Sequence, residues 1–304
     1  MLVLGGGGFI GANAANALEF AGHRAVRAGR SDADFTRDLA PADWTPRLRG
    51  IDVVVNAVGL FAGADDARLD AVHARAPIAL FDACAAAGVR VVQVSALGAE
   101  ANAPEAFLRT KAFADDHLLA THDDAVVLRP SLVYGRGGAS ARLFDALAAL
   151  PLIPLPGGGR QAIQPVHVHD VAAAIVVAVE RPHSAPRVLP VVGPGATTLR
   201  AFLDALRRQL AGARAKFVAI PPSLVRLCSR LGLPWLGSDA IAMLERGSIA
   251  DAAPLARLLG RPPRAIDAFV ERGEREAALR DARLAWLLPL ARLSLAALWL
   301  GTAA

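Results

Sequence analysis

Short apolar runs alternate with longer Ala- and Leu-rich segments along the first two thirds of the chain. Most of the runs are rich in valine and show no regular polar alternation, which is typical of strands buried on both faces of a sheet. The longer segments have the length and composition of helices. The predicted strands are 2–4, 23–28, 51–56, 89–95, 125–128 and 188–192, and the predicted helices between them are 12–18, 67–87 and 112–120.

Strands that alternate with helices predict an α/β fold with a parallel sheet covered on both faces. Because crossover connections are right-handed, the sheet should be doubly wound. After Pro151 the pattern changes: proline and glycine become frequent, and the remaining segments are mostly helical. The helices expected there are 199–210, 221–231 and 241–259.

Glycines follow the first strand directly. Gly5 to Gly8 are succeeded by Phe9, Ile10 and Gly11 and then by the first helical segment. In a strand–turn–helix of this kind, free N–H groups and the positive end of the helix dipole face an anion, and side chains would block its approach. The spacing Gly-x-Gly-x-x-Gly therefore predicts a Rossmann-type site for a dinucleotide pyrophosphate, with Gly5, Gly8, Phe9, Ile10 and Gly11 as contacts.

These patterns divide the chain into three parts. We expect a dinucleotide-binding Rossmann domain over residues 1–180 and a smaller, mostly helical lobe over 181–275 that shares the substrate cleft. A hydrophobic helix should follow over 276–304.

The end of the second strand bears on the choice of cofactor. An acidic residue there bonds the ribose hydroxyls of NAD, whereas an arginine accommodates the 2′-phosphate of NADP. Arg30 stands in this zone, with Arg27 three residues earlier, and Asp32 and Asp34 follow in what reads as a loop. The sequence thus favours NADP(H) over NAD(H), with NAD(H) left open. We expect Asp38 and Leu39 near the adenine.

The chain is basic, with a formal net charge of +5 and a sequence pI of about 10.1. Its arginines are scattered rather than clustered, which argues against nucleic-acid binding. The two cysteines, Cys84 and Cys228, form no disulfide or zinc motif, as expected in a reducing compartment. Because the first strand begins at Leu2, we expect no signal peptide and a cytoplasmic body.

Several motifs in this order resemble the extended or atypical short-chain dehydrogenase/reductase superfamily, which includes NAD-dependent epimerases and dehydratases. Other segments resemble more narrowly the NADPH-binding accessory subunit of respiratory complex I and its bacterial relatives. The resemblance covers about residues 1–210 and implies that Ala57, Val58, Gly59, Pro130 and Val133 complete the cofactor site. The superfamily motifs are 4–11, 38–39, 56–59, 94–99 and 129–135, and the narrower ones are 72–77, 164–171 and 192–194.

The chemistry of that superfamily uses a Tyr-x-x-x-Lys pair on one helix. The lysine lowers the pKa of the tyrosine, which exchanges a proton with the substrate oxygen as hydride moves. Lys111 fits the lysine position and would hold the nicotinamide ribose, but Phe107 stands where the tyrosine belongs. Ser95 fits a serine that polarises a carbonyl, and it equally fits a cap at the strand end. Tyr134, the single tyrosine, follows a different strand and has no place in this motif.

Two functions therefore stay open. The first is an oxidoreductase that acts on a small or lipophilic carbonyl through Lys111, Ser95 and an unidentified proton donor. The second is a non-catalytic NADPH-binding assembly or sensor protein associated with a membrane complex. Phe107 favours the second, and Lys111 is compatible with both.

His167, His169 and Asp170 could be read as a metal site, because residues i and i+2 of a strand point the same way. No third and fourth ligands are evident in the sequence, so we predict no metal. Asp170 is better placed to cap a helix that begins at Val171.

The C-terminal segment is almost long enough to span a bilayer, which needs about 20 apolar residues. Arg292 lies near its centre and Pro289 would kink it. Three placements of residues 284–304 stay open: a membrane anchor, an amphipathic surface helix, and a helix packed on the body. In the first two, the body would attach to the inner face of the cytoplasmic membrane, since arginines precede the segment.

Overall fold

The computed structural model describes residues 1–60, 65–181, 185–221 and 238–302. The helix expected over 221–231 therefore lies outside the described residues except for its first residue. Cys228 also lies outside them.

Six parallel strands form the main sheet in the order β10-β5-β4-β3-β1-β2. This order confirms the predicted α/β Rossmann fold. It also places the switch point at β1, between β2 and β3, where ligands bind in doubly wound sheets. The strands are β1 Leu2–Leu4, β2 Val26–Ala28, β3 Val53–Asn56, β4 Arg90–Val94, β5 Val126–Pro130 and β10 Val188–Val191.

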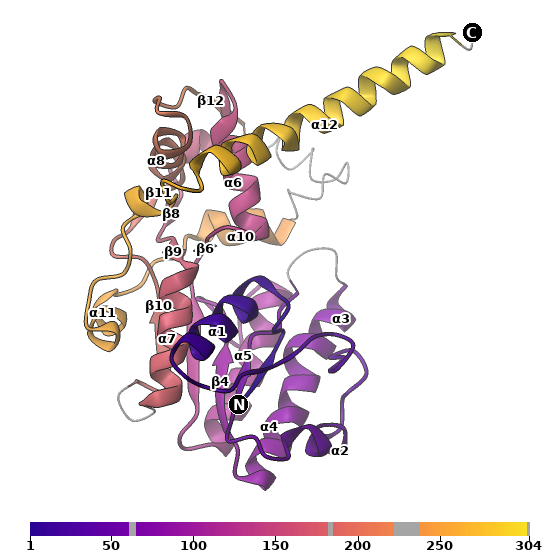
Figure 1. Ribbon diagram of the computed structural model, residues 1–304, viewed down its shortest axis with the longest axis vertical. Coiled ribbons are helices and arrows are strands. Elements are labelled where there is room, and N and C mark those ends of the chain that lie inside the picture. Colours follow the sequence, from indigo (N-terminus) through magenta and orange to yellow (C-terminus); the bar gives the residue numbers. More distant parts are fainter. Residues whose placement is uncertain (61–64, 182–184, 222–237, 303–304) are drawn as a thin grey trace.

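Two apolar clusters cover the two faces of the sheet, because successive strand residues point to opposite sides. Val54 belongs to the cluster shared with α2 Pro41–Trp44, α4 Ala76–Ala87 and α5 Ala106–Thr121. Val53 and Val55 belong to the other, shared with α1 Phe9–Phe20 and α7 Val168–Glu180. Figure 1 shows these helices on either side of the strands.

The single helix expected over 67–87 is instead three consecutive pieces. α3 Asp66–Asp70 leads into a π-helical turn, Ala71–Arg75, and then into α4, which ends at Gly88 with φ 66°. A π turn shifts the phase of the side chains, and no periodicity count could have placed it. Likewise, α5 begins at Ala106 rather than Ala112, so Phe107 and Lys111 lie on one helix.

The lobe surrounds a third apolar cluster that includes Phe202, Phe269 and Tyr134. The helix expected over 241–259 is two helices, α10 Ser238–Arg246 and α11 Ala253–Leu259, because Gly247 adopts φ 81° between them. The other elements of the lobe and of its connections are β6 Val133–Tyr134, α6 Ala139–Ala149, β7 Ile153–Pro156, β8 Ala162–Ile163, β9 Val166–His167, β11 Thr197–Thr198, α8 Leu199–Ala211 and β12 Phe217–Ile220.

The lobe segment also contributes to the main sheet. β10 follows residue 180, where we placed the domain boundary, yet it pairs with β5. α11 packs on α7. The two predicted domains thus share their packing, and their division stays a prediction.

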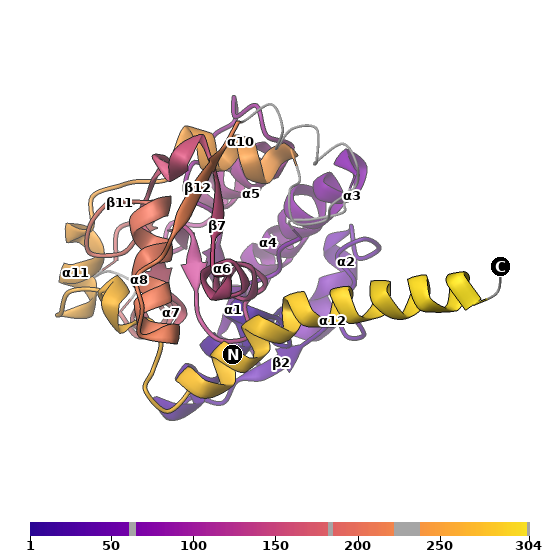
Figure 2. The same cartoon turned by 90° about the horizontal axis from the view of Figure 1, so that it is seen from above.

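The final helix, α12 Arg275–Thr302, begins against the lobe and then projects away from it (Figures 1 and 2). Its first half packs on α6 and α8, where Ala282 is buried and the Trp286 Nε1–H donates to Ala146 O at 2.7 Å. Farther along, Leu288, Leu290 and Leu295 are more than half exposed. Across the residues that the structure describes, no helix is both long enough and apolar enough to cross a membrane.

Candidate functional site

The glycine turn between β1 and α1 leaves no space for a side chain at Gly11 and requires a left-handed backbone at Gly5. A Cβ on Gly11 would lie 2.1 Å from the Gly5 carbonyl oxygen, and Gly5 itself has φ 73°. Gly8 is the N-cap residue of α1 and makes no side-chain cap, so N–H groups of the first turn face outward. The turn therefore fits a bound pyrophosphate.

A cavity of about 260 Å³ opens on this turn. Of the residues expected to bind cofactor, Gly5, Gly8, Arg30, Ala57, Val58 and Gly59 line it. Several other residues that the sequence did not single out also line the cavity, among them Phe35, Leu60 and Arg68. They lie in loops or on α3, where no motif marked them. Val72, the first residue of the 72–77 family segment, lines the cavity as well.

The acidic residues after β2 are engaged within their own loop. An Asp32 carboxylate oxygen accepts the Gly29 N–H at 2.9 Å, and Asp34 accepts both the N–H and the hydroxyl of Thr36. The bonds from Thr36 lower the pKa of Asp34. Arg30 lines both the main cavity and a second, polar cavity beside it, which Asp34, Arg37, Asp38 and Arg47 also line.

Three other residues of this region contact other parts of the protein. Arg27 bonds to Glu19 and Asn16 on α1 and is thus turned away from the cavity. Asp38 reaches the second cavity, but its Oδ2 accepts the Asp34 N–H and pairs with Arg47 at 3.0 Å. Leu39 packs against the core cluster of α2 and α4.

Other expected contacts lie beside the cavity rather than in its lining. Phe9 packs beneath the loop after β6, since a Cβ on Gly138 would lie 2.9 Å from its ring. Ile10 and Val133 pack against the cluster of α1 and α7. Pro130 is buried at the end of β5. Their roles in cofactor binding stay predictions.

Lys111 stands at the Gly59 end of the cavity. Its Nζ donates to Val94 O at 3.2 Å and lies 3.9 Å from where a Cβ on Gly59 would be. Burial lowers the pKa of this amine to about 8, and the Asp115 carboxylate one turn away opposes that shift. Phe107 is buried one turn earlier, with its ring centre 5.8 Å from Nζ, and Met243 of α10 packs against its cluster.

The Ser95 hydroxyl is committed to the interior. It donates to Asp115 at 2.6 Å, and Arg129 bonds to the same carboxylate oxygen at 3.1 Å. The Ser95 side chain is therefore held by α5 and β5, and a catalytic role for it stays a prediction. The Tyr134 hydroxyl is likewise donated to Asp145 at 2.7 Å within the lobe, and burial raises the pKa of that phenol.

His73, on the π turn, connects the cavity wall to α5. Its Nε2 accepts the Leu60 N–H at 2.9 Å, its Nδ1 lies 3.4 Å from the Thr110 hydroxyl, and its ring meets Phe107 edge-on. Burial, aided by the Lys111 charge, lowers the pKa of His73 to about 2, so the imidazole is neutral. In the sequence, this histidine is marked only by the family resemblance of segment 72–77.

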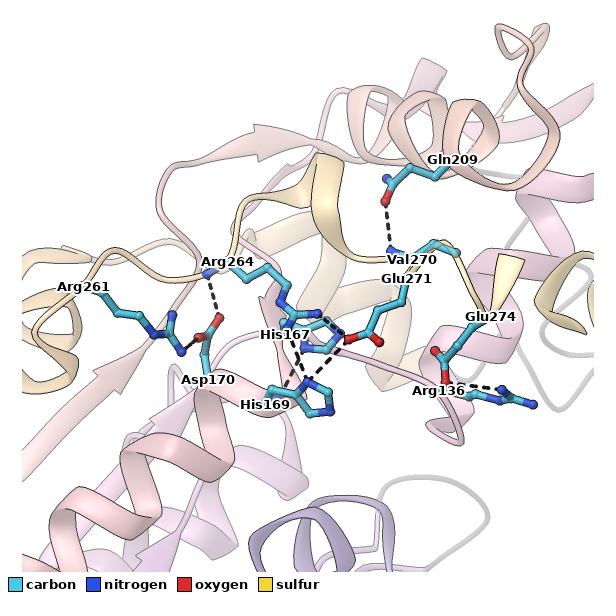
Figure 3. A network of polar contacts seen from close by, with 10 residues as sticks. All are labelled: Arg136, His167, His169, Asp170, Gln209, Arg261, Arg264, Val270, Glu271 and Glu274. Atoms are coloured by element: carbon cyan, nitrogen blue, oxygen red, sulfur yellow. Dashed lines mark hydrogen bonds and ion pairs between the residues drawn. The ribbon is translucent and has the colours of Figure 1, made fainter. Parts of the chain in front are cut away.

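The histidines near the start of α7 belong to a network that ties the body to the lobe (Figure 3). Helix α7 begins at Val168, and its N-cap is His167, so Asp170 is not the cap we expected. Both Asp170 oxygens are bound instead, by the Arg261 guanidinium and the Arg264 N–H, each at 2.7 Å. Within the described residues, no three acidic, histidine or cysteine side chains are grouped to hold a metal ion.

The fold and the glycine cradle define a Rossmann protein with a dinucleotide-type site. Residues 1–192 match the family model described as "NAD dependent epimerase/dehydratase family", and the chain belongs to that family. The resemblance to extended short-chain dehydrogenases is thereby confirmed.

Two of the curated relatives differ in what their names describe. The chain is 30% identical over 198 residues to the mitochondrial NADH dehydrogenase (ubiquinone) 1 alpha subcomplex subunit 9 of Arabidopsis thaliana, covering 59% of this chain and 49% of that protein. It is also 30% identical over 188 residues to the ceramide reductase of Caulobacter vibrioides, covering 57% and 59%. The chain thus spans only about half to three fifths of these relatives' lengths.

Solved structures share the fold. The UDP-glucose 4-epimerase of Thermus thermophilus in complex with NAD aligns with a TM-score of 0.63 at 21% identity, over 88% of this chain and 96% of that one. Pal from Bacillus thuringiensis aligns with a TM-score of 0.64 at 15% identity, over 95% and 99%.

Proposed function

We propose that this protein binds NADP(H) as a retained ligand and does not use it for ordinary carbonyl reduction, acting as an assembly or sensor component. The observation that carries the proposal is Phe107, which is buried one turn from Lys111 where the superfamily has its tyrosine. A phenyl ring has no proton to give. The nearby hydroxyl of Ser95 is donated to a buried carboxylate.

The chain's own groups would perform distinct tasks. The first-turn N–H groups of α1 would hold the pyrophosphate, and Arg30 would pair with a 2′-phosphate. Lys111 would hold the nicotinamide ribose, and His73 would fix the loop at Leu60 against α5. When bound, the dinucleotide could supply hydride; a site without a proton donor would leave that capacity unused.

Contact with a membrane or a membrane complex through residues 284–304 is part of this proposal. The relatives named as subunits of mitochondrial NADH dehydrogenase favour it, and so do the exposed leucines of α12. Arginines on the same helix could contact anionic headgroups.

A second candidate is a reductase for a lipophilic carbonyl, favoured by the similarity to a ceramide reductase and by Lys111 at the family position. One experiment separates the two. The purified full chain is titrated with NADPH and NADH, and NADPH oxidation is then followed with short and long-chain aldehydes and ketones. Binding without turnover supports the retained-ligand function. Turnover that Lys111→Ala abolishes supports the reductase, and absence of binding to either nucleotide refutes both.

A further inference from the structure

A second arginine lines the cavity. Arg68 lies on α3, after β3, whereas Arg30 follows β2. Because β1 lies between β2 and β3 in the sheet, the two arginines follow strands on opposite sides of the strand that leads into the glycine turn. The backbone of α3 is held in place, since Asp65 caps the helix through the Arg68 N–H and Leu69 is buried beneath it.

The guanidinium of Arg68, like that of Arg30, differs from those of three other arginines of the body. Arg27, Arg47 and Arg129 each bond to a carboxylate. Within the described residues, no hydrogen bond or ion pair engages the Arg68 side chain, although it borders the cavity. Val72, one helical turn further on, is buried and lines the same cavity, so the face of the segment that carries both residues borders it.

The lining residues indicate which anion Arg68 can reach. The main cavity includes the glycine turn and the loop at 57–60, and the second cavity beside Arg30 excludes both. Arg30 lines both cavities, while Arg68 lines only the one that contains the turn. Arg30 is thus placed to bind a 2′-phosphate, and Arg68 is placed to bind the pyrophosphate.

We infer that Arg68 closes over the pyrophosphate from the side opposite the helix terminus and stabilises NADP(H) and NAD(H) equally. This inference rests on the proposed dinucleotide binding and adds a residue to it. Arg30 would then determine which dinucleotide is preferred, and Arg68 how tightly either is held. A planar guanidinium can donate two parallel N–H bonds to phosphoryl oxygens, which a lysine cannot.

The test measures dissociation constants of NADPH, NADH and 2′-AMP for the full chain and for Arg68→Gln, Arg68→Lys and Arg75→Gln. Arg75 is the matched control, because it is an exposed arginine on the adjoining π turn and lies outside the cavity lining. We expect Arg68→Gln to weaken NADPH and NADH by the same factor, about 10- to 100-fold, with 2′-AMP unchanged. Arg68→Lys should recover part of the loss, and Arg75→Gln should match the wild type.

Each outcome bears on one statement. If the wild type binds NADPH and Arg68→Gln binds it equally well, the inference is wrong and the proposed function stands. If Arg68→Gln weakens NADPH but not NADH, Arg68 serves the 2′-phosphate and the inference is also wrong. If the wild type binds neither dinucleotide, the proposed function itself fails. Thermal unfolding of each variant distinguishes lost binding from lost folding.

Discussion

The two ends of the dinucleotide cavity differ in what their side chains are free to do. At the adenosine and pyrophosphate end, N–H groups of the α1 terminus and the guanidinium groups of Arg30 and Arg68 border open space. At the Lys111 end, Phe107 belongs to a small apolar cluster that Met243 packs against, and the Ser95 hydroxyl is donated inward to Asp115. Binding and proton transfer are therefore separable, and this chain has the groups for the first without the usual groups for the second.

The largest effect is expected from a phenol introduced at position 107, which would supply the missing proton donor. Phe107→Tyr adds one oxygen next to Lys111, whose charge would lower the pKa of the new phenol. If a substrate can reach that position, carbonyl reduction should rise by about 10²- to 10⁴-fold, the usual contribution of a general acid. NADPH oxidation with an aldehyde and ketone panel measures this.

The control for that variant is Phe107→Leu, which should bind NADPH and stay inactive. A Phe107→Tyr protein that binds NADPH normally and gains no activity would mean that substrate cannot reach position 107. High wild-type turnover that survives Lys111→Ala would contradict the retained-ligand function altogether.

The next prediction concerns Arg30 and the preference for NADPH over NADH. We expect NADPH to bind more tightly than NADH, and Arg30→Ala should erase a gap of about 10- to 100-fold, as for a charge-assisted contact. Isothermal titration of both nucleotides checks this. Arg27→Ala is the matched control, because Arg27 is held by Glu19 and Asn16. Equal wild-type affinities for the two nucleotides would refute the NADP preference.

The projecting half of α12 exposes leucines that the proposal assigns to membrane contact. Replacing Leu288, Leu290 and Leu295 by serine removes exposed apolar surface and should reduce binding to anionic phospholipid vesicles several-fold, with NADPH affinity unchanged. Vesicle co-sedimentation measures the change. If the full chain leaves such vesicles unbound at low salt, membrane contact through this helix is refuted.

The smallest expected effect is a pH dependence in the lobe. Burial raises the pKa of Asp145 to about 6, above its value in the unfolded chain. The folded protein therefore binds more protons than the unfolded one between about pH 4 and pH 6, and this group's contribution to stability is lost as pH rises through 6. Asp145→Asn keeps an acceptor for Tyr134 and cannot titrate.

We expect the melting temperature of Asp145→Asn relative to wild type to rise by a few degrees between pH 4 and pH 7. Thermal unfolding at several pH values measures this difference, and Asp267→Asn, an exposed aspartate of the lobe, serves as control. A difference that stays constant with pH would show that Asp145 does not titrate in this range.

Local sequence was enough to predict the main sheet and the glycine turn. Valine-rich runs have few alternatives to buried strands, and Gly11 admits no side chain because the turn brings its α-carbon against the Gly5 carbonyl. Two boundaries were predicted wrongly, since the start of α5 and the break at Gly247 depend on packing with distant segments. The role expected for Ser95 depended on the direction of one hydroxyl, which no spacing encodes.

Residue identities at short range were sufficient to predict a Rossmann fold with a glycine turn of the dinucleotide-binding type, and they place phenylalanine rather than tyrosine at position 107. Only the tertiary structure decided which side chains are free. Asp115 lies 20 residues from Ser95 and accepts its hydroxyl, and Asp34 is engaged by Thr36 while Arg68 reaches the cavity. Side-chain availability depends on partners that folding brings together, and a linear pattern does not contain them.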